Sequence, residues 1–513
     1  MITLDAIWIR YHRPEKMDLA SVLLSITILY AAIFFIDSHL KVTLSWKVIQ
    51  SLSSTIIDLF WLIQAKNPRR YQQWKQHFNI SISPMSLRWS TASCNKFLTS
   101  VGLNLSFLDW WFRLGAILTS MLILPCTILL ISTLVNSFQN FWIGSTQEVV
   151  LQAVLPGVNL PWSHFIHYFI TLAICTVFHE MGHALAAVRE QVPIIGVGFL
   201  SFLIMPAAFV EISTMALETQ APSKQLRIYS AGVWHNLVLS AVAYASCVGL
   251  PILAQPFFIV GKGVSVLNLS EPPRGAHWFF VGDQLTAVDD CSVIDSATWR
   301  SCLISAMQHP QQGYCIEEDK LIHPGNESMC CGEEVEETHL CFVRSHRNDM
   351  FCLRARSVID ASQNYCEEDK TCGKGWRCLT PQLNFSESSR LMQVKRSGSS
   401  DVLYFGEPGE LHSLLDVHDF VPRTWSSSLF VLSFTQNLLS YIFSFSAGLA
   451  VLNVVPCKAM DGQHIVMALC DLFLPFTGFH QTVVKQFIKL FVYLGTSLVA
   501  LNVIVGLVLL LPS

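Results

Sequence analysis

The sequence has little charge, and the charge that it has is balanced. Only 14% of its 513 residues are Asp, Glu, Lys or Arg, whereas a soluble globular protein carries about 25%. Apolar residues make up 52% of the chain, and its mean hydropathy is +0.44. These values argue against a soluble enzyme and favour a multi-pass membrane protein. An excess of one sign is also missing, with 33 basic and 37 acidic side chains, so we expect no nucleic-acid partner.

Long apolar windows supply the expected membrane spans, since about 20 consecutive apolar residues cross a bilayer core as a helix. The windows without Asp, Glu, Lys or Arg are residues 19–36, 114–135, 161–178, 228–261, 425–457 and 490–513. Two shorter or interrupted segments, 192–210 and 463–474, are predicted to be re-entrant or half-buried, and segment 42–63 is amphipathic at best. The predicted fold is a mainly α polytopic membrane protein with about six to eight transmembrane or re-entrant helices.

Segment 262–424 differs because it is polar and rich in cysteine. Ten of the 16 cysteines lie in it, without the paired CxxC…CxxC spacing of a zinc site. This density favours a disulfide framework in an oxidising compartment, and a cytosolic loop of reduced thiols is the less favoured alternative. The segment also contains candidate glycosylation sites at Asn326 and Asn384. We therefore predict that it is lumenal.

The lumenal assignment orients the neighbouring spans. Span 228–261 then enters from the cytosol, with Lys224 and Arg227 on its near flank, and span 425–457 returns there. The segment from 161 ends at Arg189, which also favours a cytosolic end. Two distant segments are therefore expected to finish at the same face of the membrane.

A metal-binding pattern lies inside one apolar helix, where residues 178–183 read Phe-His-Glu-Met-Gly-His. Residues four apart share a helix face, so His179 and His183 can direct their imidazoles at one zinc ion. Glu180 is then placed to act as a general base on a water molecule. The alternative, two hydrogen-bonded core histidines with an unrelated Glu, is disfavoured because such groups are costly in a lipid-embedded helix.

A catalytic zinc usually takes a third protein ligand. Asp461 is the best candidate, because it follows the returning span at the expected cytosolic face, near the helix-breaking Pro456 and the flexible Gly462. From the residues alone, an ordinary helix end with Asp461 among lipid headgroups stays open, and Glu211 and Asp471 are weaker alternatives.

These motifs resemble the site-2 protease family of intramembrane zinc metalloproteases. The resemblance rests on residues 179–183, on Gly-Val-Trp-His-Asn at 232–236, and on the stretch from Asn453 to the Asp-Gly pair at 461–462. It extends to stretches 81–89 and 155–161 and to the cysteine-rich insert, in the same order and hydrophobic setting.

The resemblance implies roles for particular residues. It makes His179, His183 and Asp461 the ligands of one Zn²⁺ and Glu180 the catalytic base. It also implies a location in the Golgi or endoplasmic reticulum and an active site near the cytosolic side. The expected substrates are single-pass membrane proteins in the lipid bilayer, such as membrane-anchored transcription factors, cut after a prior lumenal cleavage. Asn236 and Asn453 carry amides suited to hold the unwound substrate or the oxyanion, although interhelical hydrogen bonds are nearly as plausible.

The resemblance also implies a PDZ-like module in the lumenal segment. Residues 271–275 and 281–288 correspond to the glycine turn and strand of such a module, although by themselves they indicate only β structure. We expect four regions: an N-terminal membrane region (1–140), the first half of the catalytic membrane core (150–261), a lumenal PDZ-like and cysteine-rich domain (262–424), and the second half of the core (425–513).

Two other functions fit the same residues less well. A membrane zinc protease of the prenyl-protein type also uses H-E-x-x-H but takes a Glu as its third ligand. A transporter or non-catalytic receptor could instead sense metal or protons through these histidines.

Overall fold

The computed structural model describes residues 31–32, 34, 75–83, 86–143, 164–202, 205–269, 279–321, 339–344, 349–362, 364–383, 388–424, 428–477 and 480–510. These residues divide into two compact units. Residues 249–435 form one, here called the disulfide unit, and the described residues before 249 and after 435 form the membrane unit. Apart from residues 31, 32 and 34, the expected segments 19–36 and 42–63 lie outside the described residues.

Five helices of the described chain are long and apolar enough to cross a membrane. They are α6 (Leu108–Ile143), α7 (Phe165–Arg189), α9 (Pro222–Ala254), α13 (Leu429–Val454) and α15 (Gln481–Leu510). Helix α9 ends earlier than the apolar window 228–261 suggested. The chain turns there, with the N–H of Phe257 donating to the carbonyl of Ala254, and the remaining apolar residues enter a strand. The chain is therefore a multi-pass membrane protein.

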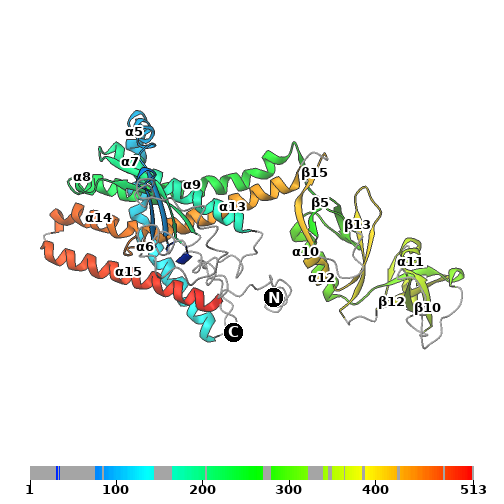
Figure 1. Ribbon diagram of the computed structural model, residues 1–513. Coiled ribbons are helices and arrows are strands. Elements are labelled where there is room, and N and C mark those ends of the chain that lie inside the picture. The colour runs from blue at the N-terminus through cyan, green and yellow to red at the C-terminus, as the bar shows by residue number, and fades with distance from the viewer. Residues whose placement is uncertain are drawn as a thin grey trace, which may run out of the picture. The chain divides into compact units, whose positions relative to one another are not determined.

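Shorter elements complete the membrane unit. They are α5 (Asn95–Asn104), α8 (Thr214–Glu218), α14 (Asp461–Thr477), β1 (Ile80–Ser83), β2 (Ser86–Thr91), β3 (Ile194–Phe202) and β4 (Met205–Ile212). The four strands form an antiparallel sheet in the order β1-β2-β3-β4, and β4 lies against α7 (Figure 1). Segment 192–210, expected to be re-entrant or half-buried, thus contributes the two antiparallel strands β3 and β4 instead of a helix, and β4 is mostly half-buried. A short apolar run does not distinguish the two by composition.

Ion pairs join one end of three membrane helices. Arg189, at the end of α7, pairs with Asp109 in the first turn of α6. The neighbouring Glu190 is buried and pairs with Arg227 and Lys224 near the start of α9. The buried carboxylate is therefore compensated by two cations, as a charge in an apolar bundle requires.

The disulfide unit contains two sheets. A six-stranded sheet is built from β5 (Phe258–Leu269), β6 (Gln284–Val288), β7 (Cys291–Ser292), β13 (Arg390–Arg396), β14 (Val402–Gly406) and β15 (Leu415–Pro422). A five-stranded sheet is built from β8 (Gly313–Glu317), β9 (His339–Arg344), β10 (Met350–Arg354), β11 (Tyr365–Cys366) and β12 (Trp376–Gln382). The helices are α10 (Ser296–Gln308), α11 (Ala355–Ala361) and α12 (Pro408–Leu414), with short 3₁₀ turns at Glu318–Lys320 and Asp369–Thr371.

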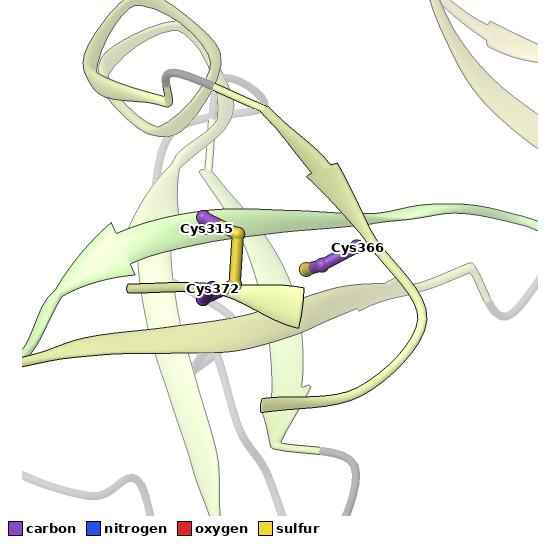
Figure 2. A group of neighbouring side chains, drawn as sticks. All are labelled: Cys315, Cys366 and Cys372. Atoms are coloured by element: carbon purple, nitrogen blue, oxygen red, sulfur yellow. A yellow bond between two sulfur atoms is a disulfide. The ribbon is translucent and has the colours of Figure 1, made fainter. Parts of the chain in front are cut away.

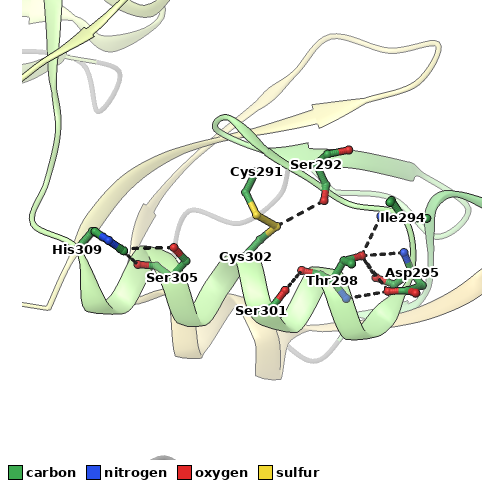
Figure 3. Close-up of a disulfide and its surroundings, with 9 residues drawn as sticks. All are labelled: Cys291, Ser292, Ile294, Asp295, Thr298, Ser301, Cys302, Ser305 and His309. Atoms are coloured by element: carbon green, nitrogen blue, oxygen red, sulfur yellow. Dashed lines mark hydrogen bonds between the residues drawn. A yellow bond between two sulfur atoms is a disulfide. The ribbon is translucent and has the colours of Figure 1, made fainter.

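The first sheet packs its inner face on α10 and α12 around a core that contains the fully buried Trp299 and Leu411. Helix α10 starts with a reciprocal cap, in which the Asp295 carboxylate accepts from the Thr298 N–H and the Thr298 hydroxyl accepts from the Asp295 N–H (Figure 3). A disulfide, Cys291–Cys302, ties this helix to β7. Residues 281–282 form a turn, and residues 284–288 after it form the strand β6, as expected from the sequence. Residues 271–275 lie outside the described chain.

Every described cysteine between residues 291 and 378 is disulfide-bonded. Cys315 pairs with Cys372 and Cys366 with Cys378, and these four residues cluster at the second sheet. Figure 2 shows the first of these disulfides with the sulfur of Cys366 beside it. The six described cysteines of the membrane unit are free thiols. Cys330, Cys331 and the sequon residues Asn326 and Asn384 lie outside the described residues.

Candidate metal centre

Two imidazoles meet on one face of α7. His179 and His183 are one helical turn apart, each is 8% exposed, and their Nε2 atoms lie 3.2 Å from each other. The expected i, i+4 geometry is therefore present, inside a packed part of the membrane unit.

A carboxylate from the far end of the sequence joins them. Asp461 is the first residue of α14, and its Oδ2 lies 3.1 Å from Nε2 of His179 and 3.3 Å from Nε2 of His183. This oxygen is buried, with no well-formed hydrogen bond among the described residues. Two imidazole nitrogens and a carboxylate oxygen thus point their lone pairs at one spot, an arrangement that needs a cation or protons between them.

The donor set fits zinc. A catalytic zinc site has three nitrogen or oxygen ligands and an open fourth position, and the three ligand atoms here lie within 4.8 Å of one another. Glu211 and Asp471, the weaker candidates for third ligand, lie elsewhere. Glu211 forms an ion pair with Arg88, and Asp471 is exposed on α14.

Helix α9 orients both rings from behind. Nδ1 of His183 lies 2.8 Å from the carbonyl oxygen of Ile228, and the amide of Asn236 lies 3.2 Å from Nδ1 of His179. The Ile228 carbonyl accepts from Nδ1–H of His183, which fixes the tautomer whose Nε2 is free to bind a metal ion, and the Asn236 contact holds the ring of His179 in place. Asn236, expected to hold substrate or the oxyanion, thus contacts a histidine ring directly.

Gly232 of α9 was not singled out for a role from the sequence. A Cβ at this position would lie 2.4 Å from Nε2 of His183 and 2.6 Å from Cε1 of His179. Only glycine lets α9 pass this close to the ligand atoms. Its place in the motif at 232–236, four residues before Asn236, was the signal available.

The turn between α13 and α14 presents Asp461. Ala459 in this turn has a positive φ of 69°, and Gly462 packs so closely on Val455 that a Cβ would lie 2.2 Å from its carbonyl oxygen. Helix α15 supports the turn, because the Thr496 hydroxyl accepts from the N–H of Lys458 at 2.9 Å. Asn453, the other amide singled out from the sequence, lies in the last turn of α13 and is half-buried.

Glu180 points to the sheet. Its Oε2 accepts a hydrogen bond from the backbone N–H of Val210 on β4, at 2.9 Å. Within the described chain β4 pairs only with β3, so Val210 directs its backbone groups to the open edge of the sheet, as does Ala208, two residues away on the same strand. The carboxylate next to the candidate metal ligands is therefore held at a strand edge that still has hydrogen-bonding groups available.

A second group of potential ligands does not form a metal site. Cys315, Cys366 and Cys372 gather closely enough to suggest one (Figure 2). All three sulfurs are in disulfides, and thiolates, not disulfides, bind metal ions.

The chain is similar to known proteins over the region that contains this cluster. The family model of peptidase family M50 matches residues 167–494, which include every residue of the His179, His183 and Asp461 cluster. A curated relative, the membrane-bound transcription factor site-2 protease homolog of Arabidopsis thaliana, is 24% identical over 374 residues, which cover 61% of this chain and 71% of that protein.

Proposed function

The chain belongs to peptidase family M50, the site-2 protease family of membrane metalloproteases, and we propose that it uses zinc to cut a peptide bond within or near a transmembrane helix of its substrate. The observation that carries this proposal is the convergence of Asp461 on the two α7 histidines. His179, His183 and Asp461 hold the zinc ion, which when bound supplies Lewis acidity to a peptide carbonyl and to water.

Glu180 performs the proton transfers. Its carboxylate is half-buried, next to a metal ligand and anchored at one oxygen by the N–H of Val210. The other oxygen takes a proton from the attacking water and returns it to the leaving amine. Asn236 keeps the ring of His179 in register, and Asn453 supplies an amide for the unwound substrate.

The substrate is extended when it reacts. A peptide bond in a helix is shielded by its own hydrogen bonds, so the segment must unwind first. The open edge of β4 offers backbone partners to an extended segment beside Glu180, as in recognition by strand addition. A segment paired there exchanges its helical hydrogen bonds for strand hydrogen bonds instead of leaving its backbone groups unpaired in lipid.

The substrates that we propose are single-pass membrane proteins, in particular membrane-anchored transcription factors first cut on the lumenal side. We place the disulfide unit in the lumen of the Golgi or endoplasmic reticulum, with Asn326 and Asn384 glycosylated. The described cysteines of this unit are disulfide-bonded, whereas those of the membrane unit are free thiols. This contrast supports an oxidising compartment around the disulfide unit. We further propose that its six-stranded sheet with α10 and α12 is a PDZ-like module that admits shortened substrates.

The active site lies near the cytosolic face in this proposal. Arg189, Lys224 and Arg227 gather at the same end of α7 and α9, as the positive-inside rule favours. His183 precedes Arg189 by six residues, or about 9 Å of helix.

The test combines metal analysis with cleavage. We expect the purified protein to contain one zinc ion and to cut a single-pass substrate. Glu180→Gln should keep the metal and lose about 10²–10⁴-fold in rate, since general acid–base catalysis contributes that much. Asp461→Asn should lose metal, whereas the exposed Asp471→Asn on the same helix should behave as wild type.

Other outcomes would favour other functions. Full zinc and full activity in Asp461→Asn would remove it from the ligand set. Zinc without cleavage of any single-pass substrate would favour a metal-sensing receptor or transporter. Cleavage confined to prenylated peptides would favour a protease of the prenyl-protein type.

A further inference from the structure

One face of the four-stranded sheet carries an ion pair that spans three strands. Arg88 on β2 pairs with Glu211 on β4, and the guanidinium carbon of Arg88 lies 4.2 Å from the ring centroid of Phe209, also on β4. The strand between them, β3, contributes only backbone at this point. The contact therefore joins β2 to β4 directly.

A glycine of β3 leaves room for this contact. Gly198 pairs with Ser90 and Phe209. A Cβ on Gly198 would lie 2.0 Å from the carbonyl oxygen of Trp89 on β2 and 2.7 Å from the Phe209 ring. A side chain at this position would therefore displace the ring over which Arg88 lies.

The ion pair sits next to a group of the active site. Glu211 directly follows Val210, whose N–H holds the Glu180 carboxylate. Arg88 and Glu211 are 43% and 38% exposed and border a polar cavity of about 430 Å³. An ion pair this exposed contributes little to the free energy of unfolding. Because it nevertheless joins β2 to β4 across the glycine-containing strand β3, we look for a role other than stability.

We infer that the Arg88–Glu211 pair is a positioning device that fixes strand β4, and through the N–H of Val210 the carboxylate of Glu180, in the orientation needed for catalysis. Arg88 and Glu211 are positioning residues, since neither contacts the metal ligands among the described contacts. This inference rests on the proposed function.

The mechanism is geometric. Arg88 contacts β4 at two points, the Phe209 ring and the Glu211 carboxylate. Phe209 and Glu211 are the two sequence neighbours of Val210, and their side chains lie on the face of the strand opposite to the Val210 side chain. Two fixed points on either side of a residue restrict both the shift and the twist of the strand there. Without them, the N–H of Val210 can still donate to the Glu180 carboxylate, but its direction is no longer fixed.

The test measures kcat, KM, zinc content and thermal unfolding of the full chain. Glu211→Gln removes the charge with little change of shape, and Arg88→Lys keeps the charge but removes the planar group over Phe209. We expect kcat to fall about tenfold in each, with KM within about twofold and zinc content unchanged, because a misplaced catalytic group costs rate and not metal binding.

Two further measurements separate positioning from folding. Hydrogen exchange of a peptide covering 205–212 should become faster in Glu211→Gln, a readout that does not depend on cleavage. The double variant Arg88→Glu with Glu211→Arg should recover more kcat than either reversal alone. Asp360→Asn, which removes the charge of an exposed ion pair with Arg356 in the disulfide unit, is the control and should change none of these values.

The inference is overturned if Glu211→Gln keeps the wild-type kcat and exchange rate. It is also overturned if kcat falls only in proportion to lost zinc or lost folded protein, since that is a purely structural role. A wild-type protein that cleaves nothing would instead contradict the proposed function.

Discussion

The two units of this protein are each stabilised internally in a different way. In the membrane unit the described cysteines are free, and the site depends on glycines that let backbones approach, such as Gly232 beside the ligand rings and Gly462 beside Val455. In the disulfide unit, described cysteines are bonded and two sheets close around cores. The residues proposed for chemistry all lie in the first unit, where no covalent crosslink constrains the described chain.

This difference has a physical reason. Helices in lipid gain little from burying apolar surface against one another, so close packing and internal polar contacts decide their arrangement. A smaller unit in water has the hydrophobic effect but a limited core, and disulfides add stability by restricting its unfolded state. Damage to each unit should therefore show in a different measurement.

The largest expected effect is on the membrane unit. Gly232→Ala places a Cβ 2.4 Å from Nε2 of His183, so α9 or the ligand ring must move. Because a catalytic metal supplies several kcal/mol of transition-state stabilisation, we expect cleavage to fall by about 1,000-fold or more, with loss of zinc. Cleavage rate and metal content are the measurements.

Gly249→Ala is the control on the same helix, since a Cβ there meets nothing within 4 Å. It should leave activity unchanged. If Gly232→Ala kept its zinc and its rate, the close approach of α9 would not be what shapes the site, and the contrast between the units would lose its main support.

The next effect falls on the disulfide unit. Cys315→Ser with Cys372→Ser opens a disulfide between residues 57 apart, which should lower the free energy of unfolding of this unit by about 4 kcal/mol. Denaturant unfolding measures the change. The zinc content of this double variant should stay the same. Cys94→Ser, which changes an exposed free thiol, is the control, and it should change neither the free energy of unfolding nor the zinc content. If the double variant lost zinc together with stability, the two units would not be independent.

The smallest effect concerns pH. Burial raises the pKa of Asp289 from 3.8 to about 6. The hydrogen bond that its carboxylate accepts from the Gln393 N–H lowers the pKa and offsets part of this rise. A carboxyl whose folded-state pKa is raised stabilises the fold at low pH, and this contribution is lost as the pH rises from about 4 through about 6. We therefore expect the disulfide unit to be less stable at pH 7 than at pH 4 on account of this group.

Asp289→Asn should remove that dependence. Asn keeps the acceptor for Gln393 and tolerates the positive φ of 50° at this position. The variant should gain about 2 kcal/mol at pH 7 and little at pH 4, measured by denaturant unfolding at both values. An unchanged pH slope would mean that burial of this carboxyl has no energetic effect, and Asp360→Asn on the exposed side of α11 serves as the control.

Much of the fold could be predicted where local pattern suffices. Four of the expected windows correspond to α6, α7, α13 and α15, because uncharged apolar runs of this length are confined to membranes. The hairpin of β3 and β4 was missed, since an apolar segment of strand length has no periodicity that separates it from a buried helix. The bounds of α9 were predicted too long for a related reason, because β5 continues its apolar run.

The candidate site divides in the same way. The sequence by itself determined the histidine pair and Glu180, because residues one helical turn apart necessarily share a face. Only the tertiary structure decided that Asp461 reaches the histidines, that Gly232 clears their rings, and that Glu211 pairs with Arg88 instead of a metal. These contacts join segments up to 282 residues apart, and their distances depend on how helices and strands pack, which spacing along the chain does not specify.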